Sequence, residues 1–141
     1  MHNSCRYTVA IHVLALLAHC GPDPLTSEYL AGSVNTNPVV IRRLLASLRA
    51  AKLVRSQGGK GGGWQLLMDP GQITLRDVLV CVDGTAIFPL HSAEPNPRCP
   101  IGKSIQALLA GPFRSAQDAL EADLDRTTIA DLVANVQAPA R

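Results

Sequence analysis

The chain has 141 residues, of which 47% are hydrophobic and only 4% aromatic, and its formal net charge at pH 7 is +2. No apolar run reaches the roughly 18–20 residues of a membrane span, and the scarcity of aromatic residues favours aliphatic helices over a β-sandwich. The length suits one domain, or a small domain with a dimerisation arm. The N-terminal segment lacks a signal-peptide cleavage site, so we expect a cytoplasmic protein with four cysteine thiols.

The charged residues are unevenly distributed along the chain. Residues 29–68 carry a net charge of +6 and no acidic residue, whereas residues 115–131 carry a net charge of −4. A basic block beside an acidic one suits a nucleic-acid-binding face and a separate solvated arm. An ordinary solvated surface would give the same counts, so charge alone does not decide between the two.

The first predicted helix covers residues 4–20, with Ser4 as its cap and Gly21-Pro22 as its end. Helical spacing assigns a core-facing stripe to Tyr7, Ile11, Leu14, Leu17 and Ala18. The two histidines of this helix lack cysteine or carboxylate partners at a metal-binding spacing, so we interpret them as surface residues rather than ligands.

Two further helices follow, separated by a tight turn. Thr26 or Ser27 caps the second helix, which we expect to break at Gly32 and the Asn-Thr-Asn triplet. Asn37 and Pro38 are favoured at the cap and first position of a new helix, predicted over residues 38–51. Its buried stripe has i, i+3, i+4, i+7 spacing and consists of Ile41, Leu44, Leu45 and Leu48.

This helix–turn–helix order predicts a DNA-recognition helix. In such motifs the N-terminal residues of the second helix enter the major groove. Arg42 and Arg43 lie in the first turns of helix 38–51, where a guanidinium can contact guanine or phosphate. The alternative is that both arginines are merely exposed charges; the cap and the following hairpin favour DNA binding.

A glycine-tipped hairpin is predicted after the third helix, with strands at residues 53–57 and 64–68. Glycines allow a sharp tip and a close approach to phosphate, and Lys60 supplies a charge there. A nucleotide-binding loop is the rival interpretation, but it requires Gly-Lys-Ser/Thr before a helix, and here Gly-Lys-Gly precedes a strand. Trp64 is interpreted as a packing residue at the base of this wing rather than a base-stacking platform.

The motif LLxxLRxxxLV over residues 44–54, together with the GGKGGGW wing, resembles the Rrf2 family of bacterial winged-helix regulators. The segments ITLRDV (residues 73–78) and TIADLV (residues 128–133) resemble the same family. The resemblance implies a homodimer on a partly palindromic operator. Many members carry an arginine at the wing tip where this chain has Gly58. Resemblance and motif together give the predicted DNA-binding residues Thr26, Asn37, Val39, Val40, Arg42, Arg43, Arg49, Gly59 and Lys60.

The sensor region departs from the cluster-binding members of that family, which resemble one another in three closely spaced cysteines. Here only Cys99 lies in the corresponding loop, with Cys81 and His91 upstream at no standard zinc or iron–sulfur spacing. We therefore expect no cofactor and no metal. Cys99 lies next to Arg98 and a helix N-terminus, which makes it a candidate redox or electrophile sensor; an inert loop cysteine is the alternative.

The C-terminal part is predicted to be helical, with a helix at 73–83, an irregular loop at 84–100, and helices at 101–110 and 113–125 separated by Gly111-Pro112. Thr127 or Thr128 caps a last short helix, and we expect residues 137–141 to be disordered. An apolar stripe of the arm is expected to form the dimer interface, although it could fold back on its own domain; it consists of Phe113, Ala116, Leu120 and Leu124.

The sequence therefore predicts a mostly α protein with a small two-stranded β wing, a winged helix-turn-helix head plus a C-terminal dimerisation helix. We assign residues 1–83 to the head, 84–100 to a sensor-type loop and 101–141 to the dimerisation helices and tail. The expected function is a homodimeric repressor on double-stranded operator DNA, redox-responsive through Cys99. A regulator answering to a small ligand and a winged-helix protein-interaction module are the alternatives. No nucleophile–base–acid arrangement supports an enzyme.

Overall fold

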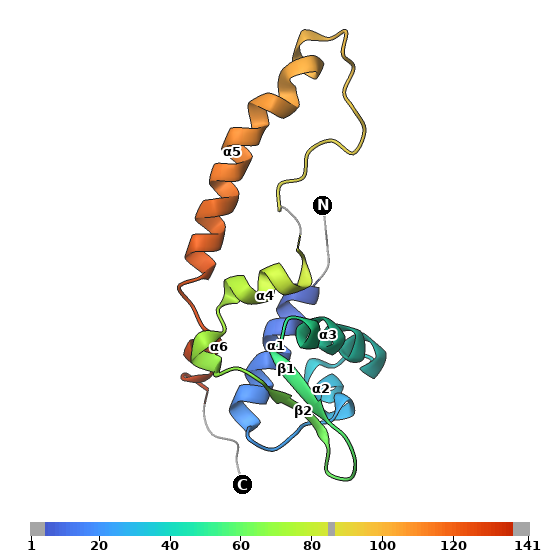
Figure 1. Cartoon of the computed structure of the whole chain (residues 1–141), viewed down its shortest axis with the longest axis vertical. Helices are drawn as coiled ribbons and strands as arrows, with labels where there is room; N and C mark the ends of the chain where they lie inside the picture. The colour runs from blue at the N-terminus through green and yellow to red at the C-terminus, as the bar shows by residue number, and fades with distance from the viewer. Residues whose placement is uncertain (1–4, 85–86, 137–141) are drawn as a thin grey trace.

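The structure is a computed structural model that describes residues 5–84 and 87–136. The described residues form a helical head with a two-stranded hairpin, from which one long helix extends (Figure 1). The elements in chain order are α1 (Arg6–Cys20), α2 (Ser27–Val34), α3 (Pro38–Ala50), β1 (Val54–Gln57), β2 (Gly63–Leu66), the 3-10 helix η1 (Pro70–Gln72), α4 (Leu75–Val82), α5 (Pro100–Leu124) and α6 (Ile129–Val133). The predicted fold class is confirmed.

The core of the head is aliphatic and is built around α1. Leu14 and Leu30 are fully buried there, as is the whole predicted stripe of α3. On α1 the fully buried residues include Ala10 and Val13, whereas Tyr7, Ile11 and Ala18 of the predicted stripe are only partly buried against the core. Aliphatic burial of this kind is the main stabilising contribution in a small domain.

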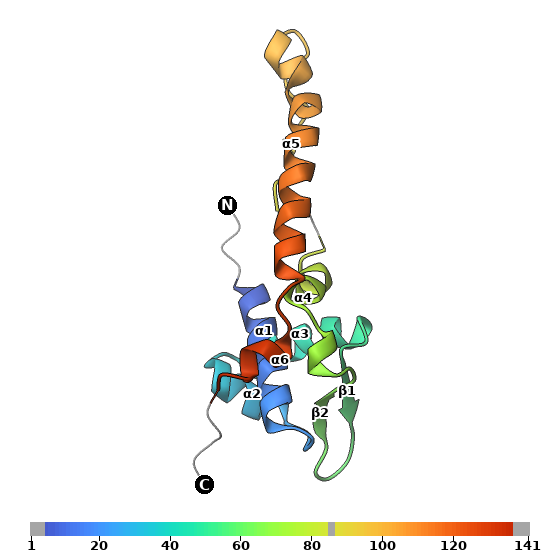
Figure 2. The same ribbon diagram turned by 90° about the vertical axis from the view of Figure 1, so that its left-hand side faces the viewer.

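The last helix returns to the head. Ile129 at the start of α6 is fully buried, and its amide donates to the Ile73 carbonyl at 2.9 Å. The Leu75 amide donates to the Thr127 carbonyl at 2.9 Å. These two backbone hydrogen bonds attach the chain after α5 to the segment that leads into α4. They place α6 beside α1 (Figure 2).

Local sequence signals explain where the helices begin. The Asn37 side chain accepts from the Val39 amide, with Pro38 in the first turn of α3, and Thr26 accepts from the Tyr29 amide at the start of α2. Reciprocal capping boxes begin α4 at Thr74 and α6 at Thr128. The predicted Ser4 cap lies outside the described residues, as do residues 137–141 with their predicted disorder.

The predicted end of α2 at the Asn-Thr-Asn triplet is confirmed, but the predicted breaks at Gly32 and at Gly111-Pro112 are wrong. Helix α2 continues through Gly32 to Val34 and ends where Asn35 adopts a left-handed conformation at φ 63°. Helix α5 is one helix of 25 residues with Pro112 inside it, not two helices that meet at Gly111-Pro112. Pro112 removes one backbone donor, but Leu108, four residues earlier, is 60% exposed, so its carbonyl can bond to water instead.

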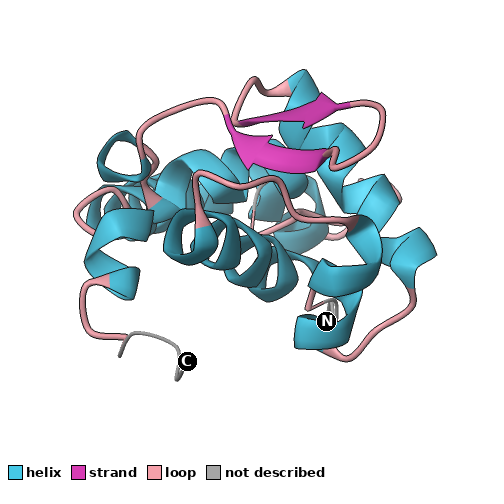
Figure 3. Ribbon diagram, turned by 90° about the horizontal axis from the view of Figure 1, so that it is seen from below, coloured by secondary structure: helices cyan, strands magenta, loops and turns pink. Residues whose placement is uncertain are grey.

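The hairpin pairs β1 and β2 in antiparallel register, with Val54 opposite Leu66 and Gln57 opposite Gly63. Its two strands lie side by side along one edge of the helical head (Figure 3). Each observed strand is one residue shorter than predicted, with β1 beginning one residue later and β2 shifted to begin one residue earlier, and α4 begins at Leu75 rather than residue 73. None of the described helices is long and apolar enough to span a membrane.

Candidate nucleic-acid interface

The outward side of α3 combines basic and apolar side chains. Arg42 and Arg43 are exposed, and Val39 and Val40 are 46% and 48% exposed. The opposite side of the same helix is buried in the core of the head. Helical geometry therefore fixes which side chains of α3 are available to a partner.

The turn between α2 and α3 fixes where α3 begins. The Asn37 Oδ1 atom accepts from the Val39 amide at 2.8 Å, while the Asn37 side chain remains exposed. The Thr26 hydroxyl accepts from the Tyr29 amide at 3.1 Å. Thr26 and Asn37 thus act as caps, and the side-chain NH2 group of the exposed Asn37 is not used by this cap.

Arg42 has an ion-pair partner that the sequence reasoning did not find. Its Nη2 atom lies 2.6 Å from Oε1 of Glu28 on α2. The Glu28 carboxylate accepts a hydrogen bond from its own backbone and another from Arg42, and both lower the pKa of this carboxyl, the backbone bond more strongly. Both side chains are more than half exposed, so the pair is screened by solvent and a phosphate can compete for Arg42.

Arg49 connects the end of α3 to the wing. Its guanidinium carbon lies 5.5 Å from the ring centroid of Trp64, a cation–π distance. Trp64 is held in turn by a backbone bridge to Leu25, with N–O distances of 2.8 and 3.0 Å. Trp64 packs against the core, as the sequence interpretation proposed, and Arg49 orients the hairpin relative to α3.

The wing tip extends away from the head and carries an exposed lysine. Gly59 and Gly61 have φ angles of 81° and 77°, a region that side chains disfavour. A Cβ atom on Gly62 would lie 2.1 Å from the Gln57 carbonyl oxygen, so this position also requires glycine. The glycine-rich tip therefore presents Lys60 to solvent on a tight turn.

Two cysteines occupy different environments. Cys99 is exposed and caps α5 without a side-chain hydrogen bond, at the end of that helix farthest from the head (Figure 1). Cys81 is partly buried against the core, and its thiol donates to the Ser47 carbonyl at 3.3 Å. Burial raises the pKa of the Cys81 thiol, and the nearby charge of Arg6 opposes this shift.

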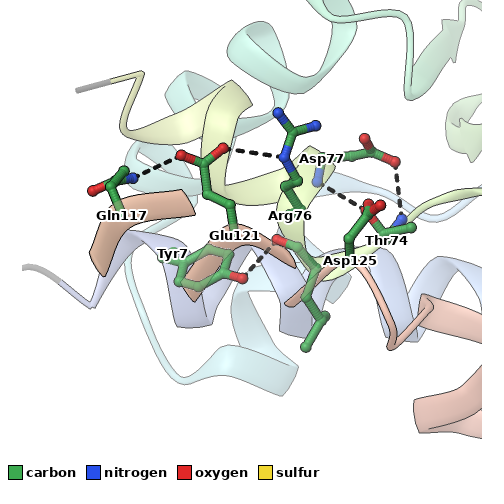
Figure 4. Close-up of polar contacts among 8 residues, drawn as sticks. Tyr7, Thr74, Arg76, Asp77, Gln117, Glu121 and Asp125 are labelled. Atoms are coloured by element: carbon green, nitrogen blue, oxygen red, sulfur yellow. Dashed lines mark hydrogen bonds and ion pairs between the residues drawn. The ribbon is translucent and has the colours of Figure 1, made fainter. Parts of the chain in front are cut away.

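Polar contacts attach the lower end of α5 to α4 (Figure 4). Arg76 Nε lies 3.1 Å from Oε1 of Glu121, and Glu121 Oε2 accepts from the Gln117 side chain at 2.9 Å. The Thr74 hydroxyl donates to Asp125 at 2.9 Å. We call these contacts, made by Thr74, Arg76, Gln117, Glu121 and Asp125, the polar strap.

Another contact in Figure 4 joins α1 to the start of α4. The Tyr7 hydroxyl donates to the Leu75 carbonyl at 2.6 Å. Burial raises the pKa of the Tyr7 phenol, so it stays protonated as a donor at neutral pH.

The predicted dimer stripe is partly covered within one chain. The Phe113 ring lies 5.5 Å from the Phe88 ring of the preceding loop, and Leu120 and Leu124 are half-buried. Ala116 is exposed, as are Ile101 and Leu108 farther along α5. The sequence stripe therefore omitted the upper part of α5, because the helix was divided at Pro112.

The comparisons with known proteins agree with this architecture. The sequence model of the Rrf2 family, described as an iron-dependent transcriptional regulator, matches residues 3–135. YwnA of Bacillus subtilis, provisionally assigned as an HTH-type transcriptional regulator, is 40% identical over 91% of this chain and 94% of its own. The HTH-type transcriptional regulator CymR of the same organism is 28% identical over 90% of this chain and 84% of its own.

Solved structures show the same fold. The structure of CymR, the global cysteine regulator of B. subtilis, matches 97% of this chain and 99% of its own, with a TM-score of 0.73 and 25% identity. IscR of T. potens matches with a TM-score of 0.69 over all of this chain and 93% of its own, but at 23% identity this likeness concerns the fold alone.

The description of the family as iron-dependent raises the question of ligands. Among residues 5–84 and 87–136, no group of three or more His, Cys, Asp or Glu side chains lies close enough together to hold a metal ion. These residues of a single chain therefore do not fit an iron centre.

Proposed function

Because the chain belongs to the Rrf2 family of HTH transcriptional regulators, we propose that it binds operator DNA as a homodimer and represses the promoter by occlusion. The observation that carries this proposal is the outward side of α3. Val39 and Val40 are about half exposed beside the exposed Arg42 and Arg43, so this side of the helix offers apolar and basic groups together. Such a side reads DNA through thymine methyl groups and through guanine or phosphate oxygens.

The remaining DNA contacts follow from the same placement. Asn37 offers a side-chain amide at the N-terminus of α3, and Thr26 lies at the N-terminus of α2. Gly59 and Lys60 bring backbone and charge to a neighbouring phosphate. In this proposal Arg49 acts through Trp64 by setting the position of the wing.

Dimerisation through α5 is supported by its exposed apolar residues. Of its side chains none is fully buried within the chain, and Ile101 and Leu108 are 65% and 60% exposed. We propose that this surface, continuing through Ala116 towards Phe113, Leu120 and Leu124, packs on the same surface of a second chain. Two-fold symmetry then presents two α3 helices to successive major grooves, roughly 34 Å apart.

The signal is proposed to act at residues 84–100. Cys99 is exposed and lies at the N-terminus of α5, so an oxidant or electrophile can reach its sulfur. A small ligand is the second candidate signal, because a hollow lined by residues of α1 and α3, among them Val9 and Val40, could hold one. Fluorescence anisotropy on promoter DNA with and without oxidant, for wild type and Cys99→Ser, separates the two. An oxidant response that persists in Cys99→Ser contradicts the thiol proposal.

The DNA-binding proposal is tested by Arg43→Gln against Arg114→Gln. Both changes remove one exposed arginine, but Arg114 lies on α5, away from α3. We expect Arg43→Gln to weaken promoter binding at least tenfold per dimer and Arg114→Gln to leave it within about twofold. Equal effects of the two variants would mean that α3 does not recognise DNA and would favour a protein-interaction role.

A further inference from the structure

A hollow of about 560 Å³ lies between the N-terminal turn of α1 and the outward side of α3. Its wall contains the aliphatic side chains of Val9, Val40 and Leu44 and the side chains of Arg6 and Arg43. None of the described residues that line it is acidic. The volume lies within the range of about 300–1,000 Å³ that small-molecule pockets occupy, and an apolar wall with a few convergent polar groups is their usual composition.

Arg6 is held at this wall by contacts to two other helices. Its Nη1 atom donates to the carbonyl of Val82, the last residue of α4, at 3.1 Å, and its Nη2 atom donates to the Ser47 hydroxyl of α3 at 2.8 Å. An arginine at a helix C-terminus is favoured by the carbonyl groups there. The positive charge of Arg6 is therefore fixed in position between α1, α3 and α4, before any ligand binds.

Arg43 lies on α3 one turn before Ser47, at the same wall. The other two arginines of α3 are engaged, Arg42 with Glu28 and Arg49 with Trp64. Among the described residues, the Arg43 guanidinium has no ion-pair partner. Arg6 and Arg43 thus place two guanidinium groups at the wall of one hollow, and both groups would attract an anion that enters it.

We infer that this hollow binds a small organic anion with an apolar tail and a carboxylate head. Arg6 and Arg43 hold the carboxylate, because guanidinium groups match carboxylate oxygens in charge and geometry. The tail lies against Val9, Val40 and Leu44. The regulatory consequence rests on the DNA-binding role proposed above: Arg43 cannot hold a ligand carboxylate and a DNA group at once, so the ligand releases the operator.

Hexanoate is a suitable probe because it has both a carboxylate and an apolar tail. Hexanol, which has the tail without the charge, and inorganic phosphate, which has the charge without the tail, are the matched controls. We expect amide resonances around Val9 and Val40 of the ¹⁵N-labelled full chain to shift saturably with hexanoate. The affinity for hexanol and for phosphate is expected to be at least tenfold weaker. Arg43→Gln should lower the affinity for hexanoate at least fivefold. Hexanol binding as tightly as hexanoate would overturn the inference and leave only an apolar hollow.

Filling the hollow provides the second arm of the test. Val9→Phe places a ring in the hollow, whereas Thr8→Phe adds the same ring at an exposed neighbour outside the lining. We expect the Val9→Phe variant to lose hexanoate binding and the Thr8→Phe variant to keep it. If Val9→Phe does not fold, Cys5→Trp narrows the same hollow from an exposed position. Retention of hexanoate by a folded filling variant overturns the inference.

The regulatory consequence is measured by anisotropy on promoter DNA at constant ionic strength. Hexanoate should weaken promoter binding by wild type and Thr8→Phe at least threefold, but not by Val9→Phe. If the filling variant itself loses DNA affinity and hexanoate causes no shifts, the hollow belongs to the DNA contact and the inference is wrong. If wild type fails to bind promoter DNA, the proposed function fails, while the resonance shifts still decide the pocket.

Discussion

Replacing Lys60 with glutamine removes one positive charge from the exposed tip of the wing in each chain. In the proposed dimer, where each Lys60 contacts a phosphate, the change would remove two such contacts, and each contact contributes about 0.9 to the slope of log affinity against log salt concentration. The slope should therefore become shallower by about 1.8. Between about 50 mM and 200 mM salt, the Lys60→Gln dimer should lose roughly twelvefold less affinity than the wild-type dimer over the same interval.

Fluorescence anisotropy of a promoter duplex, titrated at four or more salt concentrations, measures this slope. Arg114→Gln is the control, because it removes an equal charge from the exposed side of α5. Its slope should match that of wild type. An unchanged slope in Lys60→Gln, with the Arg114→Gln control behaving as expected, would show that the wing tip does not contact phosphate and would refute the placement of DNA along the hairpin.

Three further outcomes follow from the fold. Leu45→Ala, at a fully buried position, should lower the free energy of unfolding by about 2–5 kcal/mol in urea titrations; a loss below about 1 kcal/mol contradicts the assigned core. Pro112→Ala restores the donor for the Leu108 carbonyl and should raise the thermal midpoint, with only a small rise in helicity by circular dichroism; a large gain in helicity would mean that the wild-type helix is broken at Pro112. The backbone hydrogen bond of the Glu28 carboxylate and its pairing with Arg42 lower the folded-state pKa, so they stabilise the fold above the ordinary pKa of 4.5, and this stabilisation is lost as the pH falls through the lowered pKa; Glu28→Gln should flatten stability against pH in that acidic range only.

The head was predictable because its signals are local. The Asn37-Pro38 start and the spacing of Ile41, Leu44 and Leu48 each depend on residues within a few positions of one another. The glycine-rich tip is likewise explained by its own backbone angles. These patterns determined the helix-turn-helix and the wing before any packing was known.

Contacts between distant segments were not predictable. The ion pair of Glu28 with Arg42 and the stacking of Arg49 on Trp64 depend on how α2, α3 and the hairpin pack, which no spacing rule contains. The continuous α5 was missed because Pro112 normally ends a helix, and only the solvent exposure of the preceding turn makes it tolerable. Sequence patterns thus indicated which side of α3 is exposed, but the contacts of its arginines depend on how α2 and the hairpin pack beside it.

The polar strap joins the C-terminal end of α5 directly to the head, so a rotation there acts on this helix as on a lever with its pivot on α4. Its 25 residues span about 37 Å, so a rotation of about 10° at the strap displaces Cys99 by about 6 Å. A movement that starts at Cys99 has a much smaller effect on the head, since a shift of about 1 Å at Cys99 turns the head by less than about 2°. A chemical change at Cys99 can therefore reorient its own head only by moving the tip several ångströms, as a covalent link to another chain would.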